Sequence, residues 1–197
     1  MRAGAVLAGG LSKRFGQDKR FFKIGEKNLI QIACDKIRET FERRYLIVDE
    51  NFNHKIEEFI IIKDIIPKKG PLGGIYSFFK ETEENGCVFI PVDMPFLTVD
   101  LIKYLSELHE NDIAYINFKQ KIYPIPGYYS RNVQETIEEQ IRKGNFSLRD
   151  LLLKIIKKVE INEKDLIKFG NPEILLFNIN RPEDLNEIKI WLEQRSF

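Results

Sequence analysis

Short runs of apolar residues alternate along this chain with longer segments in which apolar residues recur at helical spacing. This alternation is typical of strands in a mostly parallel sheet that are connected by helices. The apolar runs predict buried strands at Ala3–Ala8, Tyr45–Val48, Phe59–Ile62, Cys87–Pro91, Ile113–Asn117 and Leu175–Asn178. The amphipathic segments predict helices at Asn28–Phe41, Leu72–Thr82, Val99–Leu108, Arg131–Arg142 and Pro182–Gln194. We therefore expect a three-layer α/β/α fold with a mostly parallel central sheet.

The segment Lys121–Tyr129 departs from this pattern, because it is apolar but contains Pro124 and Pro126. Proline has no N–H group to donate within a sheet, so we expect an edge strand or an irregular crossing here. No linker, low-complexity tract or internal repeat divides the 197 residues. The chain is therefore predicted to form one domain, residues 1–197, with a substantial core.

Composition and charge exclude several classes of protein. Apolar residues make up 43% of the chain and charged residues 31%, which is typical of a globular protein rather than a disordered one. The formal net charge of +1 indicates no general attraction to nucleic acid or to an anionic membrane. The two cysteines, Cys34 and Cys87, form no CxxC pair, so neither a disulfide framework nor a thiolate zinc site is expected. No secretory leader or spanning stretch of about 20 apolar residues is recognised, and we expect a cytoplasmic protein.

The first predicted strand leads into a loop that is rich in glycine and basic residues. Gly9 and Gly10 would let a ligand approach backbone N–H groups closely, and Arg14 and Lys19 would add charge-assisted contacts to phosphate. In an open α/β sheet, ligands bind at the carboxyl ends of strands, where this loop lies. The loop matches neither the GxGxxG motif for dinucleotides nor the GxxxxGK[ST] motif of many ATPases and GTPases. A tight turn would explain the glycine pair alone, whereas glycines and cations together favour a site for a triphosphate.

Two aspartates are expected at the same edge of the sheet. Asp93 follows the fourth predicted strand, and its carboxylate would suit Mg²⁺, which prefers oxygen ligands and shares the phosphate oxygens of a substrate. Capping of the next helix is the alternative role, although Thr98 is better placed for it. Asp64 follows the third predicted strand and precedes a glycine-rich segment, residues 70–74, that a surface turn would also explain.

These motifs together resemble the family of molybdenum cofactor guanylyltransferases. Residues 7–19, LAGGLSKRFGQDK, are similar to the family's signature LAGGxSxRMGxDK, with phenylalanine in place of methionine. Residues 92–95 resemble its C-D-M-P block, with valine in place of cysteine. Residues 64–74 resemble its D…GPLAG block, with Gly73 in place of alanine.

The resemblance continues into the second half of the chain, where residues 123–129, 147–152 and 177–185 are similar to further family blocks. Asn178 and Asn180 would lie on one face of the last predicted strand, because side chains alternate along a strand. Both could offer amide donors and acceptors to a pterin. A hydrogen-bonded strand end that caps the last helix is the alternative.

Two other positions bear on the nucleotide. Related cytidylyltransferases tend to have LAAG where this chain has LAGG, so Gly9 favours the guanine branch of the family. Asp49 follows the second predicted strand, where some members of the family have an asparagine that contacts the nucleotide. It remains a weaker candidate, because a carboxylate beside a triphosphate needs a donor such as a ribose hydroxyl.

The resemblance implies a Rossmann-like nucleotidyltransferase fold and a reaction between GTP and molybdopterin. A terminal phosphate of molybdopterin would attack the α-phosphorus of GTP, so that GMP is transferred, pyrophosphate leaves and Mg²⁺ serves as cofactor. Positioning and neutralisation of charge provide most of the catalysis in such transfers, so no protein nucleophile is expected. Arg14, Lys19 and Asp93 are implied as catalytic residues, with Asp93 as the metal ligand. The residues implied to contact GTP are Leu7, Ala8, Gly9, Gly10, Arg14, Lys19, Asp64, Gly73 and Asp93.

Three alternatives remain. A molybdopterin cytidylyltransferase, or a nucleotidyltransferase for a sugar phosphate or erythritol phosphate, would share the loop and the aspartate. A non-catalytic nucleotide-binding or cofactor-carrying module would bind GTP without releasing pyrophosphate. A GTPase switch is least favoured, because its phosphate-binding motif is missing. Proteins that deliver or accept the molybdenum cofactor are the expected macromolecular partners.

Overall fold

A seven-stranded sheet forms the centre of the computed structural model, which describes residues 3–9, 18–181 and 183–184. The strand order is β5-β4-β1-β6-β8-β7-β9. These strands are β1 (Ala3–Leu7), β4 (Arg43–Val48), β5 (Ile60–Lys63), β6 (Gly86–Pro91), β7 (Ile113–Phe118), β8 (Lys121–Ser130) and β9 (Lys158–Ile161). Only the pairs that involve β8 are antiparallel, so the predicted mostly parallel sheet is confirmed. A separate small hairpin consists of β2 (Lys23–Ile24) and β3 (Lys27–Asn28).

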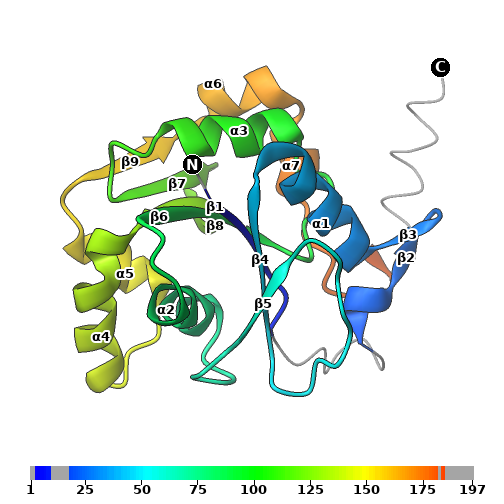
Figure 1. The fold of residues 1–197 in the computed structure, drawn as a ribbon. Helices are drawn as coiled ribbons and strands as arrows, with labels where there is room; N and C mark the ends of the chain where they lie inside the picture. Colours follow the sequence, from blue (N-terminus) through cyan, green and yellow to red (C-terminus); the bar gives the residue numbers. More distant parts are fainter. Residues whose placement is uncertain (1–2, 10–17, 182, 185–197) are drawn as a thin grey trace.

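Helices cover both faces of this sheet, which gives the three predicted layers (Figure 1). One face is covered by α1 (Leu29–Thr40), α3 (Val99–Glu107), α6 (Glu163–Leu166) and α7 (Pro172–Leu175). The other face is covered by α2 (Pro71–Glu81), α4 (Gln134–Arg142) and α5 (Leu148–Lys154). Short 3₁₀ turns are η1 (Lys19–Phe21), η2 (Arg131–Val133) and η3 (Ile167–Phe169).

Local sequence explains where the helices begin. Asn28 and Gln31 form a reciprocal capping box at the start of α1. The Thr98 side chain accepts a hydrogen bond from the first turn of α3, as predicted, so Asp93 is not needed as that cap. At the start of α2, Gly70 has a φ of 71°, which favours glycine, and Pro71 follows in the first turn.

The carboxyl ends of four neighbouring strands meet at one edge of the sheet. Backbone hydrogen bonds continue past the strands there, from Ala8 N to Ile47 O (2.8 Å), from Val92 N to Leu7 O (3.2 Å) and from Asp64 N to Val48 O (2.8 Å). The start of the first loop at Ala8, Asp64 and Asp93 are thereby brought to the same edge, as the order of strands and motifs predicts.

The predicted strand at Leu175–Asn178 is wrong. Asn171 caps a short helix there by accepting a hydrogen bond from Glu173 N, and Pro172 occupies its first turn. Residues 177–180 follow α7 without regular structure, and Ile179 N donates to Asp93 O at 2.9 Å. This segment therefore lies against the loop that carries Asp93 rather than within the sheet.

For residues 121–129 the predicted irregular strand is confirmed, but the predicted edge position is wrong. β8 lies inside the sheet, between β6 and β7. Its ladder with β7 shifts between Ala114 and Ile116, and its ladder with β6 includes only residues 127–130. Pro124 and Pro126 fall in the stretch that pairs with neither neighbour, so their missing N–H groups interrupt no ladder. An interior strand can accommodate prolines where it bulges away from its neighbours.

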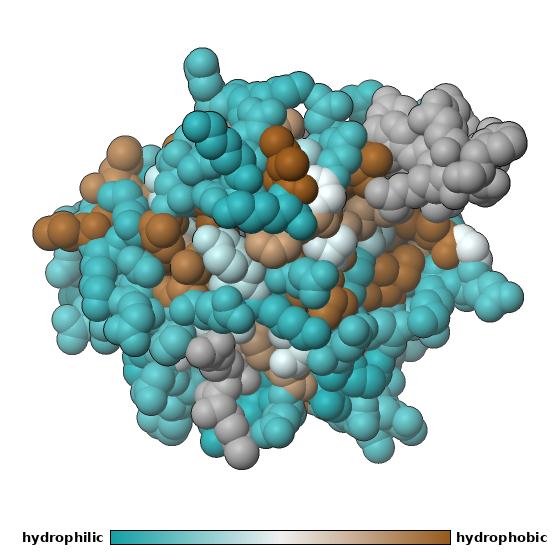
Figure 2. All heavy atoms as spheres, turned by 90° about the horizontal axis from the view of Figure 1, so that it is seen from above, coloured by the Kyte–Doolittle hydropathy of each residue, from teal (hydrophilic) through white to brown (hydrophobic). Residues whose placement is uncertain are grey.

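The outer surface is mostly hydrophilic when the molecule is seen from the side of α3 and α6, with apolar patches scattered over it (Figure 2). Within the described ranges, no helix has both the length and the hydropathy that crossing a membrane requires. Gly10, Arg14 and the predicted helix at Pro182–Gln194, apart from Glu183 and Asp184, lie outside the described residues.

Candidate active site

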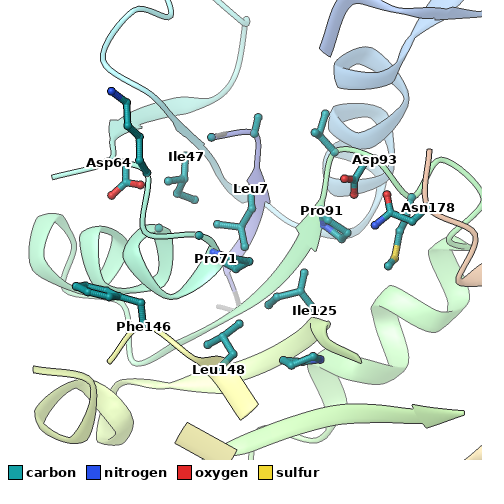
Figure 3. A pocket seen from close by; sticks show the side chains of 18 of the residues that line it. Leu7, Ile47, Asp64, Pro71, Pro91, Asp93, Ile125, Phe146, Leu148 and Asn178 are labelled. Carbon is teal, nitrogen blue, oxygen red and sulfur yellow. The ribbon is translucent and has the colours of Figure 1, made fainter. Parts of the chain in front are cut away.

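A cleft of about 700 Å³ lies at the carboxyl edge of the sheet. Its lining comes from the ends of β1, β4 and β6, the start of α2, and the segments before α5 and after α7. Asp64 lies on one side of the cleft and Asp93 with Asn178 on the other, with Leu7 between them (Figure 3). Its volume is within the range of about 300–1,000 Å³ that is usual for sites that bind small molecules.

The end of β1 forms the floor of this cleft through Leu7, Ala8 and Gly9. A Cβ added at Gly9 would have its nearest neighbours at 3.8 and 3.9 Å, from the backbone of Asp49 and Val48. These are ordinary contact distances, so the packing of the described protein does not itself require glycine at this position. The structure thus leaves the close approach of a ligand as a reason for Gly9.

Lys19 and Asp93 form an ion pair on one side of the cleft. The distance from Lys19 Nζ to Asp93 Oδ2 is 2.5 Å, and the two side chains are 20% and 16% exposed. Lys19 lies in η1 just after the first loop, and Asp93 follows β6, so the fold joins residues that are 74 positions apart. The sequence placed a phosphate-binding cation and a metal-binding carboxylate in one site, and the structure brings these two groups into contact.

Asp93 meets the requirement for a Mg²⁺ site only in part. Among the described residues, no group of three or more His, Cys, Asp and Glu side chains could hold a metal ion. One carboxylate fits Mg²⁺ when substrate phosphates and water supply the other oxygens, as is usual for nucleotide enzymes. Asp93 can provide that ligand once the ammonium group of Lys19 moves from its Oδ2 atom.

Asp64 is held in place by two hydrogen bonds to its Oδ1 atom, from Ile66 N and from the Ser77 hydroxyl, both at 3.0 Å. Burial raises the pKa of Asp64, and these hydrogen bonds partly offset that effect. Gly73 lies behind this carboxylate, since a Cβ there would come within 3.3 Å of Asp64 Oδ1 and 3.0 Å of Ile66 O. Gly73 is absent from the residues that line the cleft, whereas Gly70, Pro71 and Gly74 line it. The absence of a side chain at position 73 therefore makes room for the carboxylate of Asp64.

Arg20 is a part of the site that sequence reasoning missed. It lines the cleft and forms ion pairs with Asp18 and Asp49, both at 2.6 Å. The carboxylate of Asp49 thus already has a donor within the protein. A basic residue directly after Lys19 was visible in the sequence, but its partner 29 positions away was not.

The opposite side of the cleft contains Asn178 and Asn180, as the sequence predicts, although they are not on a strand. The Oδ1 atom of Asn178 is buried and has no hydrogen-bond partner within the described part of the structure. An unmet buried acceptor costs about 1–3 kcal/mol, so this atom is suited to a donor from a ligand. Phe146, on the side of Asp64 and Pro71, and Arg149 also line the cleft and were not proposed as site residues from the sequence (Figure 3).

A mostly parallel sheet whose carboxyl edge carries a glycine, a cation and a carboxylate around one cleft is typical of enzymes that act on nucleotides. A model of the MobA-like NTP transferase domain matches residues 4–159, and the chain belongs to this family. The protein is therefore a nucleotidyltransferase.

The relatives agree with this assignment. The chain is 31% identical to a probable molybdenum cofactor guanylyltransferase of Natranaerobius thermophilus, over 96% of each chain. It is 34% identical to a probable molybdenum cofactor guanylyltransferase of Pyrococcus horikoshii, over 93% of this chain and 97% of that one.

Solved structures confirm the Rossmann-like fold. The molybdopterin-guanine dinucleotide biosynthesis protein A of Archaeoglobus fulgidus is similar with a TM-score of 0.80 at 23% identity, over 98% of this chain and 99% of that one. The 2-C-methyl-D-erythritol 4-phosphate cytidylyltransferase of Thermus thermophilus is similar with a TM-score of 0.71 at 11% identity, over 98% and 100% of the two chains.

Proposed function

We propose that this enzyme transfers GMP from GTP to molybdopterin and releases pyrophosphate. The observation that carries the proposal is the contact between Lys19 and Asp93 in a cleft that also contains Asp64 on its other side and Asn178 beside Asp93 (Figure 3). The names of the relatives at 31% and 34% identity support guanine as the base and the molybdenum cofactor as the acceptor.

The triphosphate is assigned to the end of β1. Backbone N–H groups of residues 8–10 would contact its oxygens, together with the guanidinium of Arg14 and the ammonium of Lys19. Asp64, which is fixed by Ser77 and Ile66, would accept from an N–H group of the base or a ribose hydroxyl.

The acceptor pterin is assigned to the side of the cleft that contains Asn178 and Asn180. The unpartnered Oδ1 of Asn178 lies beside the loop of Asp93, where the two substrates would meet (Figure 3). A pterin offers ring N–H and amino donors, so it can satisfy this acceptor. In this arrangement the attacking phosphate would lie near Lys19.

The chemistry consists of attack by a phosphate oxygen of molybdopterin on the α-phosphorus of GTP, with departure of pyrophosphate. Mg²⁺ held by Asp93 and the phosphates would neutralise the negative charge that develops during the transfer. Lys19, released from Asp93, would donate to the phosphate oxygens in the transition state. Binding both substrates in one cleft supplies the orientation that a transfer without a protein nucleophile requires.

The test is a pyrophosphate-release assay with molybdopterin and each of GTP, CTP, UTP and ATP. Release with GTP alone supports the proposal, whereas release only with another nucleotide supports one of the related transferases. Tight GTP binding without any release of pyrophosphate would indicate a carrier. Asp93→Asn is expected to lower turnover on the order of a hundredfold or more, by analogy with the loss of one preorganised charge stabiliser. Asp100→Asn, on the exposed first turn of α3, removes a carboxylate outside the cleft and is the matched control.

A further inference from the structure

Arg20 connects three separate segments at the rim of the cleft. Its Nε donates to both oxygens of Asp18 at 2.9 Å, and its Nη2 donates to Asp18 Oδ2 at 2.6 Å. Its Nη1 donates to Ala8 O at 3.0 Å and to Asp49 Oδ2 at 2.6 Å. The guanidinium also lies 5.0 Å from the centre of the Phe52 ring. The side chain is only 11% exposed, so its position is well defined by these partners.

These contacts show that Arg20 is not a phosphate ligand in this arrangement. Its Nε and both terminal nitrogens already donate to protein oxygens, and the guanidinium faces two carboxylates. The guanidinium of Arg20 therefore serves to connect segments of the protein. Lys19 differs from Arg20 in this respect, because its ion-pair partner Asp93 is proposed as the metal ligand.

The three segments that Arg20 joins include the described residues at both ends of the first loop. Ala8 follows β1, Asp49 follows β4, and Asp18 lies directly before η1, which contains Lys19. Asp18 also accepts from Arg20 N at 3.1 Å and so caps η1. Since Lys19 lies between Asp18 and Arg20 in the chain, fixing both neighbours also fixes the backbone from which the Lys19 side chain extends.

Arg20 also sets the local charge. Burial alone would raise the pKa of Asp18, but the hydrogen bonds and the charge of Arg20 outweigh that effect and lower the pKa. Without Arg20, the carboxylates of Asp18 and Asp49 would lose their ion-pair partner at the rim of a site for a triphosphate. Their repulsion of the nucleotide would then be uncompensated.

We propose that Arg20 is a positioning residue that holds Lys19 at the reaction centre by joining Asp18 to the ends of β1 and β4, and that it screens Asp18 and Asp49 from the bound triphosphate. This inference rests on the proposed transfer from a nucleoside triphosphate. It assigns a role to a residue outside the motifs that the sequence singled out.

The two parts of this role affect different kinetic constants. Arg20→Ala is expected to lower kcat on the order of a hundredfold, which is typical when a catalytic group is misplaced by about 1 Å. It should also raise KM for GTP, because two carboxylates lose their counter-charge. Asp49→Asn, added to Arg20→Ala, should lower KM for GTP most of the way back to the wild-type value, because it removes one of the repelling charges. It should leave kcat low, because it does not restore the hydrogen bonds of Arg20.

Arg20→Lys tests whether the geometry of the contacts with Asp18, Asp49 and Ala8 O matters, beyond the charge. Lysine keeps the charge but lacks the planar fork that contacts Asp18 and Asp49 at once, so we expect KM near the wild-type value and a kcat that stays reduced on the order of tenfold. Arg38→Ala is the matched control, because Arg38 lies on α1, pairs with Asp35 and Glu58 and does not line the cleft. Its kinetic constants should remain those of the wild type.

The outcomes separate this inference from the proposed function. If the wild type releases no pyrophosphate with any nucleotide, the proposed function fails. If the wild type is active and Arg20→Ala has a normal kcat, or if Asp49→Asn fails to lower KM in the Arg20→Ala background, the inference about Arg20 is overturned. Thermal unfolding of each variant shows whether it is folded under the assay conditions, and Arg20→Lys provides the kinetic comparison if Arg20→Ala is not.

Discussion

Lys36 provides a quantitative test of the structure around Asp93. It lies on α1, its side chain is partly buried, and its amino group donates to the carbonyl oxygen of Pro95, two residues beyond Asp93. Burial lowers the pKa of Lys36 from 10.5 to about 8, although the charge of Asp35 opposes this effect. The difference of 10.5 − 8 corresponds to about 3 kcal/mol in favour of the neutral amine in the folded state.

The sign of the pH dependence follows from this difference. Between about pH 8 and pH 10.5 the unfolded chain binds more protons at Lys36 than the folded chain does, so the free energy of unfolding rises with pH. Below pH 8 the amine is charged in both states, and the full cost of burying that charge is present. From about pH 7 to about pH 9.5, the contribution of Lys36 should stabilise the protein by about 2 kcal/mol.

The assay is urea unfolding of the wild type and of Lys36→Met at those two pH values. The change in free energy of unfolding between the two pH values should be about 2 kcal/mol more favourable for the wild type, because methionine does not titrate. Tyr45 and Cys87, whose pKa values burial raises, also titrate at high pH, but they are present in both proteins and cancel in the comparison. Equal pH dependence in the two proteins would show that the Lys36 amine is not buried against Pro95.

Three other changes test separate parts of the structure. Glu84, which is 5% exposed, accepts hydrogen bonds from Arg43 and Tyr45, so Glu84→Gln should lower the free energy of unfolding by about 1–3 kcal/mol in urea unfolding. Gly127→Ala would place a Cβ 2.5 and 2.7 Å from two backbone oxygens, and should lower stability by about 1–3 kcal/mol, seen as a reduced Tm; an unchanged Tm would contradict the irregular path of β8. Gly9→Ala has room for its Cβ, so it should keep the stability of the wild type within about 0.5 kcal/mol. It should also lose part of the preference for GTP over CTP, measured as the ratio of the kcat/KM values.

The sequence was sufficient to predict most of the sheet and the position of the cleft. Apolar runs identified the strands that carry the motifs, and the rule that ligands bind at carboxyl ends placed Asp64 and Lys19 at one edge. The apolar residues of Leu175–Asn178 looked like a strand, but the capping signal at Asn171 and Pro172 was the stronger local determinant. The segment after α7 lies beside Asp93 because Ile179 N donates to Asp93 O. These two residues are far apart in the sequence, so no local pattern predicts the contact.

Which charges of the site are available to substrates could not be read from the motifs at all. Asp49, Arg20 and Lys19 all lie near the cleft, and each is a plausible nucleotide contact by residue type alone. The structure shows that Arg20 donates to Asp18, Asp49 and Ala8 O, so its guanidinium is taken up by protein oxygens and its charge faces two carboxylates rather than a phosphate. Lys19 differs, because its ion-pair partner Asp93 is the carboxylate that we propose as the ligand of Mg²⁺. Asp93 would hold a metal ion that accompanies the nucleotide, and Lys19 would then donate to oxygens of the triphosphate instead of to Asp93. The Lys19–Asp93 ion pair would therefore open when the metal ion and the triphosphate bind together. The hydrogen bonds of Arg20 to Asp18, Asp49 and Ala8 O would meanwhile keep the surrounding backbone in place.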